Sequence, residues 1–289
     1  MGSAVLVTGA AGRLGTLIVE AFADREVIAA TRASLDITDP AAVRRVVSKT
    51  KPSVIINCAA FNDVDGAEDS PSAALAANAF GVRSLARAAE SCGATLVHYG
   101  TDFVFDGAAS DPYEETAIPS PRSTYAASKL LGDWFALDMS RALVLRVESL
   151  FGCDAGWSGI RGTLDTLADG VRAGREVRVF TDRVVSPSYM PDVVAATRYL
   201  VDRGTPGLYH CVNSGQATWL QVTEESARLM GVTPRLRPTT MEQVRMRAHR
   251  PRFCALSNRK LAAAGFVMPT WQDALRRWLG DSRQQAAAN

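Results

Sequence analysis

Residues 4–15 read AVLVTGAAGRLG, and this stretch decides the fold. Ala4 to Thr8 is a short apolar run, as expected of a buried strand, and it ends at Gly9. From Arg13 to Ala23 apolar residues recur every three or four positions, which predicts an amphipathic helix. A strand, a glycine-rich turn and a helix in immediate succession are typical of the first unit of a Rossmann sheet.

The glycines of this turn have the spacing G-x-x-G-x-x-G. One glycine permits a tight turn, the next lets a pyrophosphate approach the backbone, and the last lets the helix pack on the strand. The helix N-terminus adds N–H groups and the positive end of its dipole. The turn therefore predicts a dinucleotide site that includes Gly9, Gly12, Arg13, Leu14 and Gly15.

The same alternation continues along the first half of the chain. Segments separated by about ten residues or more of helical pattern predict a doubly wound parallel sheet with right-handed crossovers. Strands are expected at Val27–Thr31, Val54–Asn57, Thr95–Tyr99 and Leu143–Val147, an extended piece at Leu35–Ile37, and helices at Pro40–Lys49, at Ser72–Ser91 and around Tyr125.

After about residue 150 glycines and prolines interrupt the pattern, and the elements become shorter. The predicted organisation is an NADP-binding Rossmann domain over residues 1–150. Residues 151–289 are expected to form mainly a smaller substrate-binding lobe, with some segments returning to the Rossmann sheet.

Composition excludes several classes of function. The 289 residues include 32 basic and 30 acidic side chains, so a net charge of +2 gives no general attraction to nucleic acid or to a membrane. No apolar run is long enough to span a bilayer and no signal peptide is evident, so a cytoplasmic protein is expected. Five scattered cysteines without a C-x-x-C, and three histidines without ligand spacing, predict neither a disulfide framework nor a metal site.

The second predicted strand ends in Thr31-Arg32, where a site for NAD would usually place an acidic residue. Arg32, helped by Arg13, could pair with the 2′-phosphate of NADP(H) through its planar guanidinium. The sequence therefore predicts a preference for NADP(H), with NAD(H) possible. The alternative is that both arginines simply face solvent.

The candidate chemical centre lies in residues 123–133, STYAASKLLGD. Tyr125 and Lys129 are four residues apart and share one face of a predicted helix. Thr101 emerges at the carboxyl end of a predicted strand, where ligands bind in open α/β sheets. These groups suit the protonation of a carbonyl, with Tyr125 as acid and the charge of Lys129 lowering the pKa of its phenol. The alternative is an ordinary amphipathic helix with a surface lysine.

Together the glycine turn, GTDFVFDG at 100–107 and the Y-x-x-x-K pair resemble the extended short-chain dehydrogenase/reductases, specifically the dTDP-4-dehydrorhamnose reductase family. The likeness runs nearly end to end. It includes LDITD at 35–39, INCAAFNDVDGAE at 56–68, AANAFGV around Asn78, LRVESLFG at 145–152, GLYHCVN at 207–213, RPRFCALSNRKL at 250–261 and WQDAL at 271–275.

The resemblance implies a role for each matching residue. Thr101, Tyr125 and Lys129 would be the catalytic triad that reduces a sugar C4 carbonyl, and Tyr125 and Lys129 would also contact the cofactor. The remaining implied contacts are Asp36 and Ile37 beside the adenine, Ala59 and Ala60 along the cofactor, and Val64, Asp65, Thr101 and Phe103 near the substrate.

Departures from the family pattern fall mostly on the substrate side. Gly100 replaces the usual serine, and Ala126 the usual glycine. Glu148, a further candidate for substrate binding, stands where the family usually has a small hydroxylated residue, and Gly159 to Thr163 lacks the usual Asn-Phe. Arg250 lies in a basic segment and is a candidate ligand of the substrate diphosphate.

The resemblance implies NADPH-dependent reduction of a nucleotide-linked 4-keto-6-deoxysugar, by default dTDP-4-dehydrorhamnose to dTDP-rhamnose. A different keto-sugar nucleotide is the first alternative. A second is a non-catalytic role, because the family includes an NADP-binding regulatory subunit of methionine adenosyltransferase. The expected partners are the nucleotide sugar alone, without nucleic acid, membrane or metal, in a monomer or homodimer. The sugar, the base, the product stereochemistry and the strictness for NADPH stay open.

Overall fold

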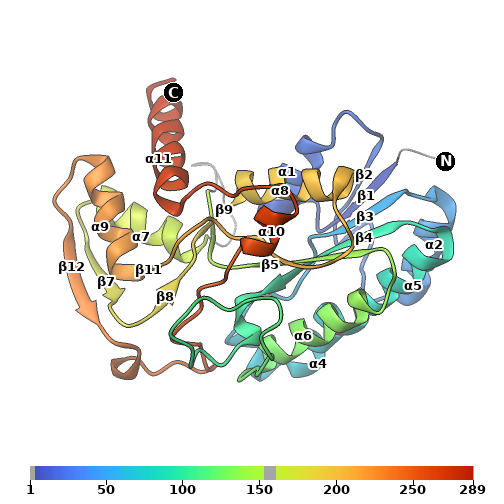
Figure 1. Ribbon diagram of the computed structural model, residues 1–289, viewed down its shortest axis with the longest axis horizontal. Helices are drawn as coiled ribbons and strands as arrows, with labels where there is room; N and C mark the ends of the chain where they lie inside the picture. The colour runs from blue at the N-terminus through green and yellow to red at the C-terminus, as the bar shows by residue number, and fades with distance from the viewer. Residues whose placement is uncertain (1–3, 153–160, 289) are drawn as a thin grey trace.

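The computed structural model describes residues 4–152 and 161–288, with side chains described as far as residue 280. A parallel sheet of six strands, in the order β10-β5-β4-β3-β1-β2, forms the larger part of the molecule (Figure 1). Its strands are β1 (Val5–Thr8), β2 (Val27–Ala30), β3 (Val54–Asn57), β4 (Thr95–Thr101), β5 (Ala142–Val147) and β10 (Gly207–His210). The predicted doubly wound α/β fold is confirmed.

Helices cover both faces of this sheet. Val5 and Val7 of β1 belong to one apolar core with α1 (Arg13–Ala21) and α8 (Met190–Arg203). Leu6, between them, points to the opposite core, which includes α2 (Pro40–Thr50), α5 (Val82–Cys92) and α6 (Thr124–Leu137). The continuous apolar character of β1 follows from this burial on both faces.

The helix predicted over Ser72 to Ser91 is divided into three parts. After the short α3 (Gly66–Asp69), α4 (Pro71–Leu75) leads into a π-helical segment, η1 (Ala76–Gly81), and then into α5. Asn78 lies in the wide turn, where its side chain bonds both the N–H and the carbonyl of Phe61 and donates to Ser128. These long-range contacts hold the π turn against α6.

The extended piece predicted at Leu35–Ile37 pairs with no strand among the described residues. Its apolar character has another cause, because Leu35 and Ile37 are buried in the core beside α2 and α5.

A smaller lobe lies at the other end of the molecule (Figure 1). Its apolar core includes Phe151, Leu164, Trp219, Leu275 and Trp278. Short strand pairs frame it: β6 (Leu150–Phe151) with β9 (Ser188–Tyr189), β7 (Glu176–Phe180) with β12 (Arg235–Thr239), and β8 (Val184–Val185) with β11 (Ala217–Thr218). Its helices are α7 (Thr163–Arg172), α9 (Trp219–Met230) and α11 (Trp271–Ala288).

The chain crosses between the two parts more than once. After β9 it returns to the large sheet through α8 and β10, which pairs with β5. The segment after β12 runs back toward the large sheet through the 3₁₀ turn η3 (Met241–Gln243) and the short α10 (Arg259–Ala263). No helix in the described ranges is long and apolar enough to cross a bilayer.

The glycine turn is packed too tightly for side chains. Gly9 has a φ of +65°, and a Cβ there would lie 2.6 Å from the main-chain nitrogen of Ala59. A Cβ on Gly15 would overlap the carbonyl oxygen of Gly9 and lie 2.9 Å from Cα of Ala10. The close approach of α1 to the first turn therefore requires glycine at both positions.

We predict that Gly15→Ala lowers the free energy of unfolding by about 1–3 kcal/mol, the usual cost of overpacking, as measured by urea denaturation. Gly280→Ala is the matched control, because a Cβ at that exposed helical position meets nothing within 4 Å. The control should be neutral or stabilising by up to about 1 kcal/mol. Equal stability of the Gly15→Ala and wild-type proteins would show that the turn has more room than the packing indicates.

Candidate active site

A cavity of about 870 Å³ lies at the carboxyl edge of the large sheet, facing the lobe. Its walls include the glycine turn, the loops after β3, β4 and β5, and the start of α6. The lobe contributes Arg161, Gly162, Thr163, Arg183 and Arg250. This is where a doubly wound sheet is expected to bind its ligands.

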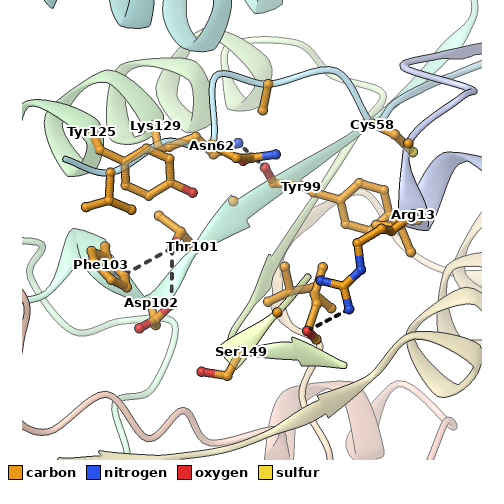
Figure 2. A pocket seen from close by; sticks show the side chains of 18 of the residues that line it. Arg13, Cys58, Asn62, Tyr99, Thr101, Asp102, Phe103, Tyr125, Lys129 and Ser149 are labelled. Carbon is orange, nitrogen blue, oxygen red and sulfur yellow. Dashed lines mark hydrogen bonds between the residues drawn. The ribbon is translucent and has the colours of Figure 1, made fainter. Parts of the chain in front are cut away.

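Thr101, Tyr125 and Lys129 all line this cavity, although they come from two different elements. Thr101 is the last residue of β4, and the other two project from α6. The helix begins after Ser123, whose hydroxyl accepts a hydrogen bond from the N–H of Ala126 at 3.2 Å. Figure 2 shows the Tyr125 ring above Thr101, with Lys129 next to Tyr125.

Lys129 is a buried cation. Its Nζ donates a hydrogen bond of 2.5 Å to the main-chain oxygen of Tyr99. Burial lowers the pKa of its ammonium to about 8, although the negative charge of Asp133 acts in the opposite direction. Asp133 is itself held by Arg146, whose Nε lies 3.0 Å from Oδ2. The unusual Gly100 fits here, since a Cβ at that position would lie 2.7 Å from the Asp133 carboxylate.

The expectation that Lys129 lowers the pKa of Tyr125 is wrong for this structure. Burial raises the pKa of the phenol, the negative charge of Asp102 raises it further, and only a hydrogen bond with Thr101 lowers it. Tyr125 therefore keeps its proton at neutral pH. A protonated phenol in a cavity is suited to donate its proton to a ligand oxygen.

Most of the predicted cofactor contacts surround the same cavity. Gly12, Arg13, Leu14 and Gly15 line it, as do Ala59 and Ala60 after β3. Gly9 lies beneath the turn, against the backbone at residues 58 and 59.

The side chain of Arg13 has partners within the protein. Its Nη2 lies 2.5 Å from Oδ2 of Asp165 and 3.3 Å from the carbonyl oxygen of Leu150. Arg13 therefore ties the glycine turn to the lobe, a contact that its position in the sequence did not indicate.

Arg32, Asp36 and Ile37 do not line the cavity. The Arg32 side chain is 90% exposed, with its Nε 3.7 Å from Oδ2 of Asp36. Asp36 also accepts hydrogen bonds from Thr38, which together with Arg32 lower the pKa of its carboxyl. Ile37 is buried against Gly81 of the π-helical segment.

The predicted substrate contacts divide into two groups. Val64 and Phe103 line the cavity, and the Phe103 ring meets Tyr125 edge-on with centroids 5.7 Å apart. Asp65 and Arg250 bind each other through two hydrogen bonds of 2.8 and 2.9 Å, and Arg250 lines the cavity.

Glu148 is placed differently from the expectation. Its side chain is buried and does not line the cavity, and its Oε2 accepts a hydrogen bond of 2.6 Å from the N–H of Ser186. Of the unusual segment Gly159 to Thr163, residues 159 and 160 lie outside the described residues, whereas Arg161, Gly162 and Thr163 line the cavity.

Several cavity residues were not predicted. Asp102 directly follows Thr101 within GTDFVFDG, so its position was evident from the sequence, but its burial was not. Asn62 and Asp63 belong to the loop after β3, Ser149 follows β5, and Arg183 comes from the lobe. No local pattern in a single sequence connects these loops.

Comparison with known proteins assigns the family. The model of the RmlD substrate-binding domain matches residues 3–284, almost the whole chain. The protein belongs to the RmlD family. The resemblance seen in the sequence is thereby confirmed.

Relatives of the RmlD family match over nearly their full length. The dTDP-4-dehydrorhamnose reductase of Streptomyces griseus is 36% identical over 287 residues, which cover 94% of this chain and 90% of that protein. A dTDP-4-dehydrorhamnose reductase of Mycobacterium tuberculosis is 37% identical over 281 residues, with 94% and 90% covered.

Solved structures of the family agree with the fold. The dTDP-4-dehydrorhamnose reductase of Clostridium acetobutylicum superposes with a TM-score of 0.91 at 31% identity, covering 97% of this chain and 99% of that one. The enzyme of Bacillus anthracis, solved in complex with NADP, also has a TM-score of 0.91 at 29% identity, with 97% and 100% covered.

The Asp65–Arg250 pair joins the loop after β3 to the segment that follows β12, next to the cavity. We predict a coupling free energy of about 1 kcal/mol between Asp65→Asn and Arg250→Gln in a double-mutant cycle of unfolding. The value is modest because the two side chains are 37% and 19% exposed.

The same cycle on Glu225 and Arg228, a pair three residues apart within the single helix α9, serves as the control. It should give less than about 0.5 kcal/mol. A coupling at Asp65–Arg250 that is indistinguishable from zero would mean that the pair does not hold the two segments together.

Proposed function

We propose that this protein is an NADPH-dependent reductase of the C4 keto group of a dTDP-linked 6-deoxysugar, with dTDP-4-dehydrorhamnose as the default substrate. The observation that carries the proposal is the convergence of Thr101, Tyr125 and Lys129 on one cavity with the glycine turn. The name shared by relatives that match over more than nine-tenths of this chain supports the choice of substrate.

The residues of the glycine turn fit an NADP(H) molecule. No side chain caps α1 at Gly12, so the first N–H groups of the helix are available to phosphate oxygens. The tight packing at Gly9 and Gly15 keeps the backbone open to a pyrophosphate. Bound there, NADPH supplies the hydride for the carbonyl carbon.

The residues of the triad handle the proton. Tyr125 holds its proton because burial raises the pKa of the phenol, and it gives that proton to the carbonyl oxygen as negative charge develops there. Thr101, at the end of β4, adds a hydroxyl beside the same oxygen. The buried ammonium of Lys129, four residues along the same helix, orients the nicotinamide ribose.

On the substrate side we assign Val64 and Phe103 to the sugar and Arg250 to the diphosphate, with Asp65 as the partner that orients Arg250. In this assignment phosphate oxygens compete with Asp65 for the guanidinium of Arg250. Arg161 and Arg183 add further cations to the cavity wall on the lobe side. The cytoplasmic location and the monomeric or dimeric state remain predictions.

A different keto-sugar nucleotide is the second candidate. One relative, 35% identical over 288 residues, is named a probable dTDP-4,6-dihydroxy-2-methyloxan-3-one 4-ketoreductase from Streptomyces antibioticus. That name keeps the C4 reduction and changes the sugar. An NADPH-oxidation screen over several 4-keto nucleotide sugars, with the product configuration determined by NMR, separates the two candidates.

We predict that Tyr125→Phe lowers kcat by about a hundredfold or more and leaves the Kd for NADPH nearly unchanged, because only the proton donor is lost. Tyr199→Phe is the matched control, since Tyr199 donates to the carbonyl of Ala264 and does not line the cavity. NADPH binding without turnover by the wild type, across a panel of keto sugars, would instead favour a non-catalytic binding role.

We predict that Arg32→Ala lowers kcat/KM with NADPH about tenfold and leaves kcat/KM with NADH unchanged, because an exposed guanidinium can turn to the 2′-phosphate. Arg13→Ala should change kcat/KM with NADPH and kcat/KM with NADH more equally, because the Arg13 guanidinium is already paired with Asp165. An equal loss with both cofactors in Arg32→Ala would remove Arg32 as the source of NADPH preference.

A further inference from the structure

Glu148 faces away from the cavity that its neighbours line. It is the first residue after β5, and Val147 and Ser149 on either side of it are lining residues. Ser149 has a φ of +45°, a conformation that is strained for a residue with a side chain. Figure 2 shows the Ser149 side chain at the cavity. The carboxyl of Glu148 therefore lies within the protein wall of the cavity.

In this wall Glu148 meets three other buried groups, of which Asp102 and Arg183 also line the cavity. Carboxylate oxygens of Glu148 and Asp102 and the sulfur of Cys254 all lie within 4.8 Å of one another. Nη2 of Arg183 lies 3.7 Å from that sulfur, and the guanidinium stacks 5.4 Å from the centre of the Phe103 ring. Asp102 directly follows Thr101, so the cluster adjoins the catalytic hydroxyl.

The charges of this cluster do not balance if both acids are ionised. Arg183 is its one cation, whereas Asp102 and Glu148 would bring two negative charges into the interior. Burial raises the pKa of the Cys254 thiol, which stays neutral. An uncompensated charge in the interior is costly, and neighbouring carboxylates avoid ionising together. One retained proton makes the cluster neutral.

Two carboxylate oxygens without hydrogen-bond partners indicate where that proton lies. Within the described residues, Oδ2 of Asp102 and Oε1 of Glu148 are buried without a hydrogen-bond partner, as is Nε of Arg183. A proton on one carboxyl turns it into a donor while the other remains an acceptor. A small rotation of a carboxyl group can then join the two oxygens and satisfy both.

We propose that Glu148 and Asp102 share a single proton and that this buried acid pair positions the hydroxyl of Thr101. The positioning role rests on the proposed reductase function, whereas the shared proton does not.

The two acids have different roles within the pair. Burial and the charge of Asp102 raise the pKa of Glu148 well above its usual range, and Ser186 and Arg183 only partly oppose this. Burial raises the pKa of Asp102 to about 6, against the charge of Arg183. At neutral pH the pair therefore retains one proton, and the charge of Arg183 and the hydrogen bond from Thr101 favour the ionised form of Asp102.

Ionised Asp102 fixes the direction of the Thr101 hydroxyl. Oγ1 of Thr101 donates a hydrogen bond of 3.1 Å to Oδ1 of Asp102 and accepts one of 3.3 Å from the N–H of Phe103. Below a pH of about 6 a second proton enters the pair, and Asp102 stops being an anionic acceptor. Its charge also raises the pKa of Tyr125, so this protonation alters both the position of Thr101 and the acidity of Tyr125.

A metal ion is the competing occupant, since two carboxylates and a thiol are possible ligands. Arg183 favours the proton, because its guanidinium already places a positive charge in the cluster.

The shared proton is tested by infrared spectroscopy at pH 7, where ordinary carboxyl groups are ionised. We expect a carbonyl band of a protonated carboxyl in the wild type that shifts in heavy water. It should disappear in Glu148→Gln, and also in Asp102→Asn, because one carboxylate then faces one guanidinium. Glu225→Gln should leave the band unchanged, because the hydrogen bond from Arg228 lowers the pKa of Glu225 and keeps it ionised.

A wild type without such a band at pH 7, or a band that persists in Glu148→Gln, would overturn the proposal. So would stoichiometric Zn²⁺ binding to the wild type that is lost in Glu148→Gln. A wild-type spectrum without the band is enough to reject the proposal, so this part of the test does not depend on whether a variant folds. It also requires no turnover, so it separates this inference from the proposed function.

The positioning role is tested by the pH profile of kcat. Wild-type activity should fall as the pH decreases through about 6, where Asp102 takes up a proton. In Asp102→Asn that acid limb should disappear, since the amide keeps an acceptor for Thr101 but has no proton to gain. An acid limb that is the same in both proteins would overturn the role of the pair in positioning Thr101.

Discussion

Burial of charge beneath the carboxyl edge of the sheet is the constraint on which the site depends. Taking ionisable groups out of water favours their neutral forms, so it lowers the pKa of Lys129 and raises that of Tyr125. The protein offsets this cost with fixed partners. Asp133 and Arg146 lie on the side of Lys129, and Asp102 with Arg183 on the side of Thr101. The phenol of Tyr125 stays protonated between these two groups.

Much of the fold could be predicted because its signals are local. The glycine turn and the alternating strands and helices are enough to indicate a doubly wound sheet. The π-helical segment could not be predicted in this way. It depends on Asn78 reaching Phe61 and Ser128, which come from two other parts of the chain. The buried Leu35–Ile37 piece likewise has an apolar pattern without a partner strand.

The candidate site could also be predicted where its signals are local. Tyr125 and Lys129 share a helical face and Thr101 ends a strand, so sequence spacing could bring them together. Spacing does not report burial, and for that reason the predicted direction of the Tyr125 pKa was wrong. Two further features are tertiary contacts with the lobe. Arg13 pairs with Asp165, and the carboxylate of Glu148 accepts a hydrogen bond from the N–H of Ser186. The sequence alone does not indicate these contacts, because the residues that make them are far apart along the chain.

Hydride transfer to the sugar is the central claim, and isotope labelling tests it most directly. The wild-type protein is incubated with dTDP-4-dehydrorhamnose and NADPH that carries deuterium at the transferable C4 position of the nicotinamide. Mass spectrometry and NMR of the product should find one deuterium on C4 of the sugar in dTDP-rhamnose. Oxidation of NADPH without deuterium in the sugar, or no oxidation with any 4-keto nucleotide sugar, would contradict the account.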